Sequence, residues 1–145
     1  MADPKDIIIG EISNTLSKLV GQSAGAVLRR AGSQASHRLW PELPSDQTID
    51  QAGEIMRQGV EGLGGFGAFE LSDDGEGGAR IQFRDCFFAT MTDDPAKKCG
   101  RQPICFFGFG LVEETLMRLT GIRTRVEIVR HDVETSTCHE VARPR

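Results

Sequence analysis

The chain contains no tyrosine and a single tryptophan, and its aromatic character comes from eight phenylalanines. Most of these lie between Phe83 and Phe109, a concentration that indicates an apolar interior or pocket rather than a stacking platform for bases. The chain also lacks a clustered basic surface: the net charge is −4 and the isoelectric point is about 5.4. Binding to DNA or RNA is therefore not expected.

Long apolar runs are missing too. No segment approaches the ~18 consecutive apolar residues that a membrane-spanning helix needs, so we expect no membrane span. The first ten residues, MADPKDIIIG, contain neither a basic leader nor a small-residue cleavage site. On this basis we expect a cytoplasmic protein.

Patterns typical of catalysis are scarce. The sequence shows no Ser, His and Asp arrangement, no pair of carboxylates in an evident acid–base setting and no H-E-x-x-H, so no catalytic residue is predicted. The string GLGGFG at residues 62–67 fits G-x-G-x-x-G. However, it follows a predicted helix and precedes a predicted strand, which is the reverse of the dinucleotide-binding order. We interpret it as a connector.

Hydrophobic periodicity divides the chain into helical and extended parts. Three helices are predicted at about 3–20, 23–40 and 48–62, the last opened by a capping box of Thr48 and Gln51. Two strands, 66–71 and 79–88, flank the turn sequence SDDGEGG and predict a hairpin. A helix at 104–120 ending before Gly121 and two strands at 123–130 and 137–142 follow.

This order, ααα-ββ-α-ββ, predicts a single α+β domain over residues 1–145, with helices packed on one face of a four-stranded antiparallel sheet. The helix at 104–120 is apolar around most of its circumference, so it should be buried on more than one side. It also keeps Gly108 and Gly110, each of which costs about 1 kcal/mol relative to alanine. Two explanations stay open: close packing of another backbone, or a ligand cavity beside the glycines.

A metal site is a further candidate. Cys105 begins the apolar helix, where the partial positive charge of a helix N-terminus favours a thiolate. Glu127, His131 and Cys138 follow on the two closing strands, and thiolate, imidazole and carboxylate are the groups that zinc prefers. No C-x-x-C pair is present, Cys99 is an alternative ligand, and small buried cysteines are common without a metal.

Several segments together resemble the vinyl-4-reductase domain family: GQSAGAVLRRAG at 21–32, PICFFGFGLVEETLMRLTG at 103–121, RVEIVR at 125–130 and TCHEV at 137–141. The resemblance covers most of the chain and implies a small ligand-binding module that forms homodimers through its first helices. It also implies zinc ligation by Cys105, Glu127 and Cys138. The family's cysteine three residues after the carboxylate is replaced by Arg130, so His131 could serve only if the strand is bulged or ends there.

These observations predict a non-catalytic module, acting as sensor or carrier, that encloses a small hydrophobic ligand. The family resemblance implies a preference for phenolic, hydrocarbon-like or tetrapyrrole compounds. The predicted lining comprises Trp40, Phe83, Phe87, Phe107, Phe109 and Leu111. The first alternative is an accessory or substrate-presenting subunit of a partner enzyme in (bacterio)chlorophyll or tetrapyrrole reduction. The second is an interaction scaffold with a solid core.

Overall fold

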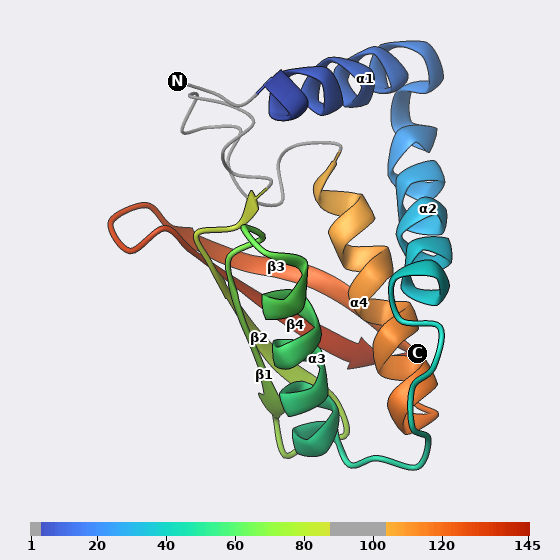
Figure 1. Ribbon diagram of the computed structural model, residues 1–145, viewed down its shortest axis with the longest axis vertical. Helices are drawn as coiled ribbons and strands as arrows, with labels where there is room; N and C mark the ends of the chain where they lie inside the picture. The colour runs from blue at the N-terminus through green and yellow to red at the C-terminus, as the bar shows by residue number, and fades with distance from the viewer. Residues whose placement is uncertain (1–3, 88–103) are drawn as a thin grey trace.

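The computed structural model describes residues 4–87 and 104–145 and has the predicted order of elements (Figure 1). Its helices are α1 (Pro4–Val20), the short 3-10 turn η1 (Gly21–Ser23), α2 (Ala24–Leu39), α3 (Ile49–Leu63) and α4 (Cys105–Thr120). Its strands are β1 (Ala68–Asp73), β2 (Ala79–Arg84), β3 (Thr124–Asp132) and β4 (Thr137–Pro144). The α+β prediction is therefore confirmed.

The four strands form one antiparallel sheet in the order β1-β2-β4-β3. The predicted hairpin is present, since Phe69 of β1 pairs with Phe83 of β2. The second strand is shorter than expected and ends at Arg84, whereas the two closing strands extend further than predicted. The closing pair places β4 in the sheet interior, between β2 and β3.

Helices α3 and α4 cover one face of the sheet, and α2 lies against α4 as an outer layer (Figure 1). Residues of α3, α4 and all four strands share one hydrophobic core, in which Leu116 and Leu119 of α4 meet Ile81 and Val126 of the sheet. Alternate strand residues such as Glu70 face away from it. Helix α1 extends away from the sheet and touches the rest of the described chain mainly through η1 and α2.

The ends of two helices follow the signals in the sequence. Thr48 accepts a hydrogen bond from the backbone N–H of Gln51, and the Gln51 side chain accepts one from the Thr48 N–H, so the predicted capping box is present. Gly121 ends α4 in the left-handed conformation at φ 80°, which glycine adopts without a steric penalty. These local devices set where α3 and α4 lie along the sheet.

Small residues allow α2 and α4 to pack backbone to backbone. A Cβ on Gly110 would overlap the carbonyl oxygen of Arg29, and a Cβ on Gly32 would overlap that of Phe107. Of the two explanations left open for the glycines of this helix, close packing of another backbone therefore applies to Gly110, which contacts the backbone of α2. Arg29 of α2 adds polar contacts, because it donates to Glu113 of α4 at 3.2 Å and to the carbonyl of Val126 in β3 at 2.7 Å.

Candidate functional site

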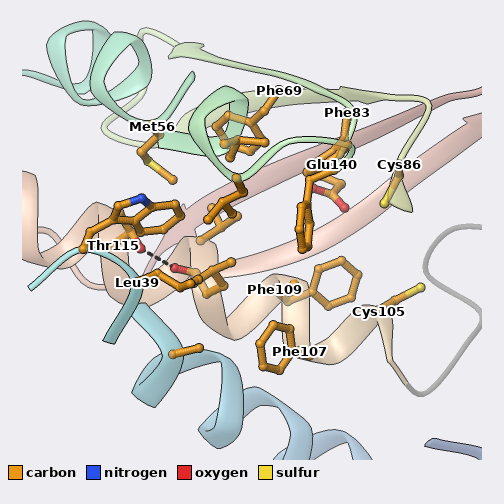
Figure 2. A pocket seen from close by; sticks show the side chains of 18 of the residues that line it. Leu39, Met56, Phe69, Phe83, Cys86, Cys105, Phe107, Phe109, Thr115 and Glu140 are labelled. Carbon is orange, nitrogen blue, oxygen red and sulfur yellow. Dashed lines mark hydrogen bonds between the residues drawn. The ribbon is translucent and has the colours of Figure 1, made fainter. Parts of the chain in front are cut away.

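A cavity of about 320 Å³ lies between the helices and the sheet (Figure 2). Helices α2, α3 and α4 contribute to its wall, as do strands β1, β2 and β4. Almost all of the side chains that line it are apolar. Its volume falls near the lower end of the range typical of small-molecule sites, ~300–1,000 Å³. The space therefore suits a compact apolar ligand.

Helix α4 contributes the largest share of the wall. Cys105, Phe109, Val112 and Thr115 recur at helical spacing, which directs them toward the sheet and the cavity. Gly108 also lines the cavity. The two explanations left open for the helix glycines therefore apply to different residues: Gly110 receives a backbone and Gly108 borders the cavity.

The opposite wall comes from α3 and the first hairpin. Met56, Val60 and Leu63 lie three or four residues apart on α3 and so share one side of the helix. Phe69 and Phe83 from the paired strands pack edge to face, with ring centroids 5.6 Å apart. Edge-to-face aromatic pairs contribute about 0.5–1.5 kcal/mol beyond their buried area, so this pair stabilises the wall.

The C-terminal end of α2 closes a further side with Leu39, Trp40 and the exposed Arg38. This end is held by Arg118 of α4, which donates to the carbonyls of Ser36 and Trp40 at 2.8 and 2.7 Å. The Ser36 carbonyl also accepts from the backbone N–H of Trp40 at 3.1 Å, so Arg118 adds a second bond there and provides one for the carbonyl of the C-cap residue Trp40. These bonds therefore fix the position of Trp40 relative to α4.

Glu140 is a buried acid in the mostly apolar lining, whose other polar members are Arg38 and Thr115. Its carboxyl group points in among Phe83, Phe109 and Cys86 (Figure 2), and the residue is only 8 % exposed. No hydrogen bond or ion pair involves its side chain within the described residues. Burial raises the pKa of Glu140 from 4.5 to about 8, because a carboxylate loses its hydration in these surroundings. At neutral pH the group is therefore mainly the uncharged acid.

The hydroxyl group of Thr115, which also lines the cavity, already has hydrogen-bond partners. Thr115 donates to the carbonyl of Leu111 at 2.7 Å, and its oxygen lies 2.8 Å from the hydroxyl of Ser36. The sulfur atoms of Cys86 and Cys105 also lie in the cavity wall on the side of Glu140 (Figure 2). Among the described lining residues, a ligand in the cavity would thus meet one carboxyl group in mainly apolar surroundings.

Five of the six predicted lining residues border this cavity: Trp40, Phe83, Phe107, Phe109 and Leu111. Phe87 does not. Its ring packs instead on Phe66, with centroids 4.7 Å apart, although Phe66 itself lines the cavity. That these residues bind a ligand stays a prediction.

The structure brings together only some of the predicted metal ligands. His131 and Cys138 are paired across β3 and β4, with Nδ1 3.3 Å from Sγ. The register shifts between Ile128 and Arg130, which is the bulge that a role for His131 requires. Cys105 lies in the cavity wall at the start of α4.

Glu127 lies elsewhere. It alternates with buried Val126 on β3, so it faces the outer side of the sheet, where it accepts a hydrogen bond from Arg143 at 3.2 Å. Among residues 4–87 and 104–145, no three His, Cys, Asp or Glu side chains are grouped as a metal would need, and Cys99 lies outside those ranges. Zinc binding stays a prediction.

Sequence reasoning overlooked Glu140. The available signal is the alternation in TCHEVARP, which places Glu140 on the same face as Cys138 and Ala142. The other alternating set, His139, Val141 and Arg143, is equally mixed in polarity, so the string alone does not decide which set faces the core. Pairing with Ile81 of β2 and Ile128 of β3 decides it.

Comparison with solved structures shows a shared fold. A trafficking protein particle complex subunit 3 from Naegleria fowleri, covalently bound to palmitic acid, matches 97% of this chain and 95% of its own at 12% identity and a TM-score of 0.62. A Cs H-NOX mutant covers all of this chain and 76% of its own at 14% identity and a TM-score of 0.56. A Tt H-NOX variant covers all of this chain and 74% of its own at 13% identity and a TM-score of 0.53.

No family model matches the chain, and no curated protein matches it significantly. The similarity to these proteins is therefore a similarity of fold and not of sequence. In the part of the chain that the structure describes, no helix has the length and apolar character needed to cross a bilayer.

Proposed function

We propose that this protein is a non-catalytic binding module for a compact hydrophobic ligand, acting as a sensor or carrier. The observation that carries the proposal is the apolar cavity of about 320 Å³ lined by α2, α3, α4 and the sheet. The side chains that line the cavity lack packing contacts on that side. Occupation by a ligand would recover these contacts. The cavity also argues against the scaffold alternative, which needs a solid core.

Apolar burial would supply most of the affinity. A ligand that places roughly 200 Å² of apolar surface in the cavity gains about 5 kcal/mol at 25 cal/mol per Å², before the cost of association. The structure of the trafficking complex subunit, which shares the fold, contains covalently bound palmitic acid. That likeness supports an apolar occupant for the fold, whereas the modest cavity volume favours a compact compound here.

The resemblance to the vinyl-4-reductase domain supports the same class of function and adds tetrapyrroles and phenols as candidates. A tetrapyrrole macrocycle is large compared with a cavity near the lower end of the usual range. We therefore place the accessory role in tetrapyrrole reduction second. It predicts a shift of the pigment absorption band when a tetrapyrrole is mixed with the protein, and absence of that shift would count against it.

Homodimerisation is the second part of the proposal. Helix α1 exposes several large apolar side chains, including Ile7, Ile8, Ile12 and Leu19, which are 54 to 79% exposed. A second copy of the chain would cover them, as the family resemblance implies. Light scattering should show a dimer that Ile8→Glu together with Ile12→Glu converts to a monomer. A monomeric wild-type protein would refute this part.

By the resemblance, zinc binding depends on Cys105 and Cys138, and it requires reduction of Cys138, whose sulfur is disulfide-bonded in the structure. Elemental analysis of freshly purified protein tests it directly. If zinc is present, Cys105→Ser should release it and lower the melting temperature together. If the wild-type protein contains no zinc, the metal prediction is removed while the ligand-binding proposal is unaffected.

The cavity itself is tested by filling it. Trp40 is the single tryptophan and lines the cavity, so its emission reports occupancy directly. Titration with ethylcyclohexane should change this emission in a saturable way. Val60→Phe, at a cavity-lining position, should abolish the response, whereas Val27→Phe on the exposed side of α2 should not. A wild-type protein that gives no saturable response would refute the proposal.

A further inference from the structure

The buried acid in the cavity wall needs a partner. Glu140 is 8 % exposed, and its carboxyl group makes no hydrogen bond within the described chain. A buried polar group without a hydrogen bond costs roughly as much as its lost hydration, and native proteins rarely retain one. An apolar residue such as leucine would avoid this cost. The retained carboxyl group therefore indicates a bond that forms only when the cavity is occupied.

In the part of the chain that the structure describes, the elements around Glu140 contribute no buried counter-ion. Its strand neighbours are Ile81 and Ile128, and the nearby groups that can ionise are the sulfurs of Cys86 and Cys105. Arg38 also lines the cavity, but it is exposed on the outer layer of helices. Along the same face of the closing strands come Cys138 and its cross-strand neighbour His131, which contact each other.

The chemistry of the ligand's polar group follows from these surroundings. A carboxylate would place a second acid beside Glu140 in an apolar space, where a charge without a partner is costly. An ammonium group would bring three N–H donors to a wall that offers one carboxyl group, and burying the ion pair would cost the hydration of both charges. A neutral oxygen needs only one hydrogen bond, which a carboxyl group buried among apolar side chains with no counter-ion in the described chain can donate.

We propose, on the basis of the ligand-binding function above, that Glu140 is the polar anchor of the cavity and hydrogen-bonds a single neutral oxygen of an otherwise apolar ligand. The oxygen belongs to a carbonyl or a hydroxyl group. The aromatic pair of Phe69 and Phe83 and the apolar side of α4 hold the hydrocarbon part. The carboxyl group thereby selects oxygenated compounds over plain hydrocarbons.

Four probes of similar size test this selection through Trp40 emission: ethylcyclohexane, cyclohexyl methyl ketone, cyclohexanecarboxylate and cyclohexylmethylamine. With the wild-type protein at pH 7, we expect the ketone to bind about five- to tenfold more tightly than the hydrocarbon, the advantage of one neutral hydrogen bond. The carboxylate and the amine should bind more weakly than the ketone. If either charged probe binds more tightly than the ketone, the proposal is wrong.

Two variants separate hydrogen bonding from shape. Glu140→Met has a similar length without a strong donor, so it should keep hydrocarbon binding and lose the ketone preference. Glu140→Gln retains N–H donors and should keep much of the preference. Glu127→Gln, on the outer face of the sheet, should leave the ranking unchanged. A preference that survives in Glu140→Met overturns the role of Glu140 alone.

The outcomes for the two proposals are distinct. If none of the four probes binds to the wild-type protein, the ligand-binding function fails, and the role of Glu140 fails with it. If the hydrocarbon binds but the ketone has no advantage, ligand binding stands and only the anchor is refuted. The wild-type ranking by itself decides between these results, so the test does not depend on the stability of a variant.

Discussion

The buried Glu140 should make the protein less stable as the pH rises from about 4.5 to about 8. Burial raises the pKa of this carboxyl group to about 8 in the folded protein, while the unfolded chain keeps the ordinary value of 4.5. Between these values the folded protein holds a proton that the unfolded chain has released. The free energy of unfolding falls with pH wherever the folded state binds more protons.

The expected size follows from the same two values. At about 1.4 kcal/mol per pH unit, the interval from 4.5 to about 8 corresponds to a loss of roughly 4 to 5 kcal/mol, which is an upper bound if water enters the cavity. This is a large share of the ~5–15 kcal/mol by which small domains are stable. Below pH 4.5 and above pH 8 the contribution of Glu140 should be constant.

Urea unfolding of the wild-type protein and Glu140→Gln at several pH values measures the effect. Glutamine does not ionise, so the stability of the variant relative to the wild type should increase steadily from pH 5 to pH 8. Glu70→Gln, which replaces an exposed carboxylate on the outer face of the sheet, serves as the control and should show a nearly constant difference.

Other carboxyl groups change the pH profile of both proteins equally. Hydrogen bonds from Arg57 lower the pKa of Glu54, and the backbone N–H of Thr135 lowers that of Asp132. Their contributions are lost as the pH falls and cancel when the variant is compared with the wild type. If that difference is the same at pH 5 and pH 8, the Glu140 carboxyl group is hydrated or paired, and the reasoning from burial is refuted.

Three further substitutions test the packing that frames the cavity. Gly110→Ala should destabilise the protein by roughly 1–3 kcal/mol in urea unfolding, because its Cβ would overlap the carbonyl of Arg29. Gly62→Ala, where a Cβ meets nothing within 4 Å, should instead stabilise by about 0.5 kcal/mol; equal effects at the two glycines would contradict the close helix contact. Thr48→Ala should cost about 1 kcal/mol by removing the bond to the Gln51 N–H, and an unchanged midpoint would show that the cap is dispensable.

Local features of the fold could be predicted from the sequence because they depend on residues that are close together in the chain. The capping box at Thr48, the stop at Gly121 and the hairpin turn at 72–78 each act within a few residues. The spacing of apolar and aromatic residues likewise predicted an apolar helix over 104–120 that is buried on several sides. Five predicted lining residues consequently border one cavity.

The site residues that escaped prediction depend on strand pairing. Glu140 and Glu127 are both acids on short strands, and nothing next to them in sequence shows which one is buried. The register and the bulge after Ile128 put Glu140 and His131 on the inner face and Glu127 on the outer face. Phe87 similarly follows the end of β2 and turns to Phe66 rather than to the cavity.

By itself the sequence determined the order of helices and strands, the absence of basic clusters and long apolar runs, and the enrichment in phenylalanine around one helix. Only the tertiary structure decided that the helices leave a cavity against the sheet and that, among the described residues, one buried acid lines it without a hydrogen-bond partner. The physical reason is that periodicity is a local property of the backbone. Burial of a particular side chain instead depends on which distant segments pack against it.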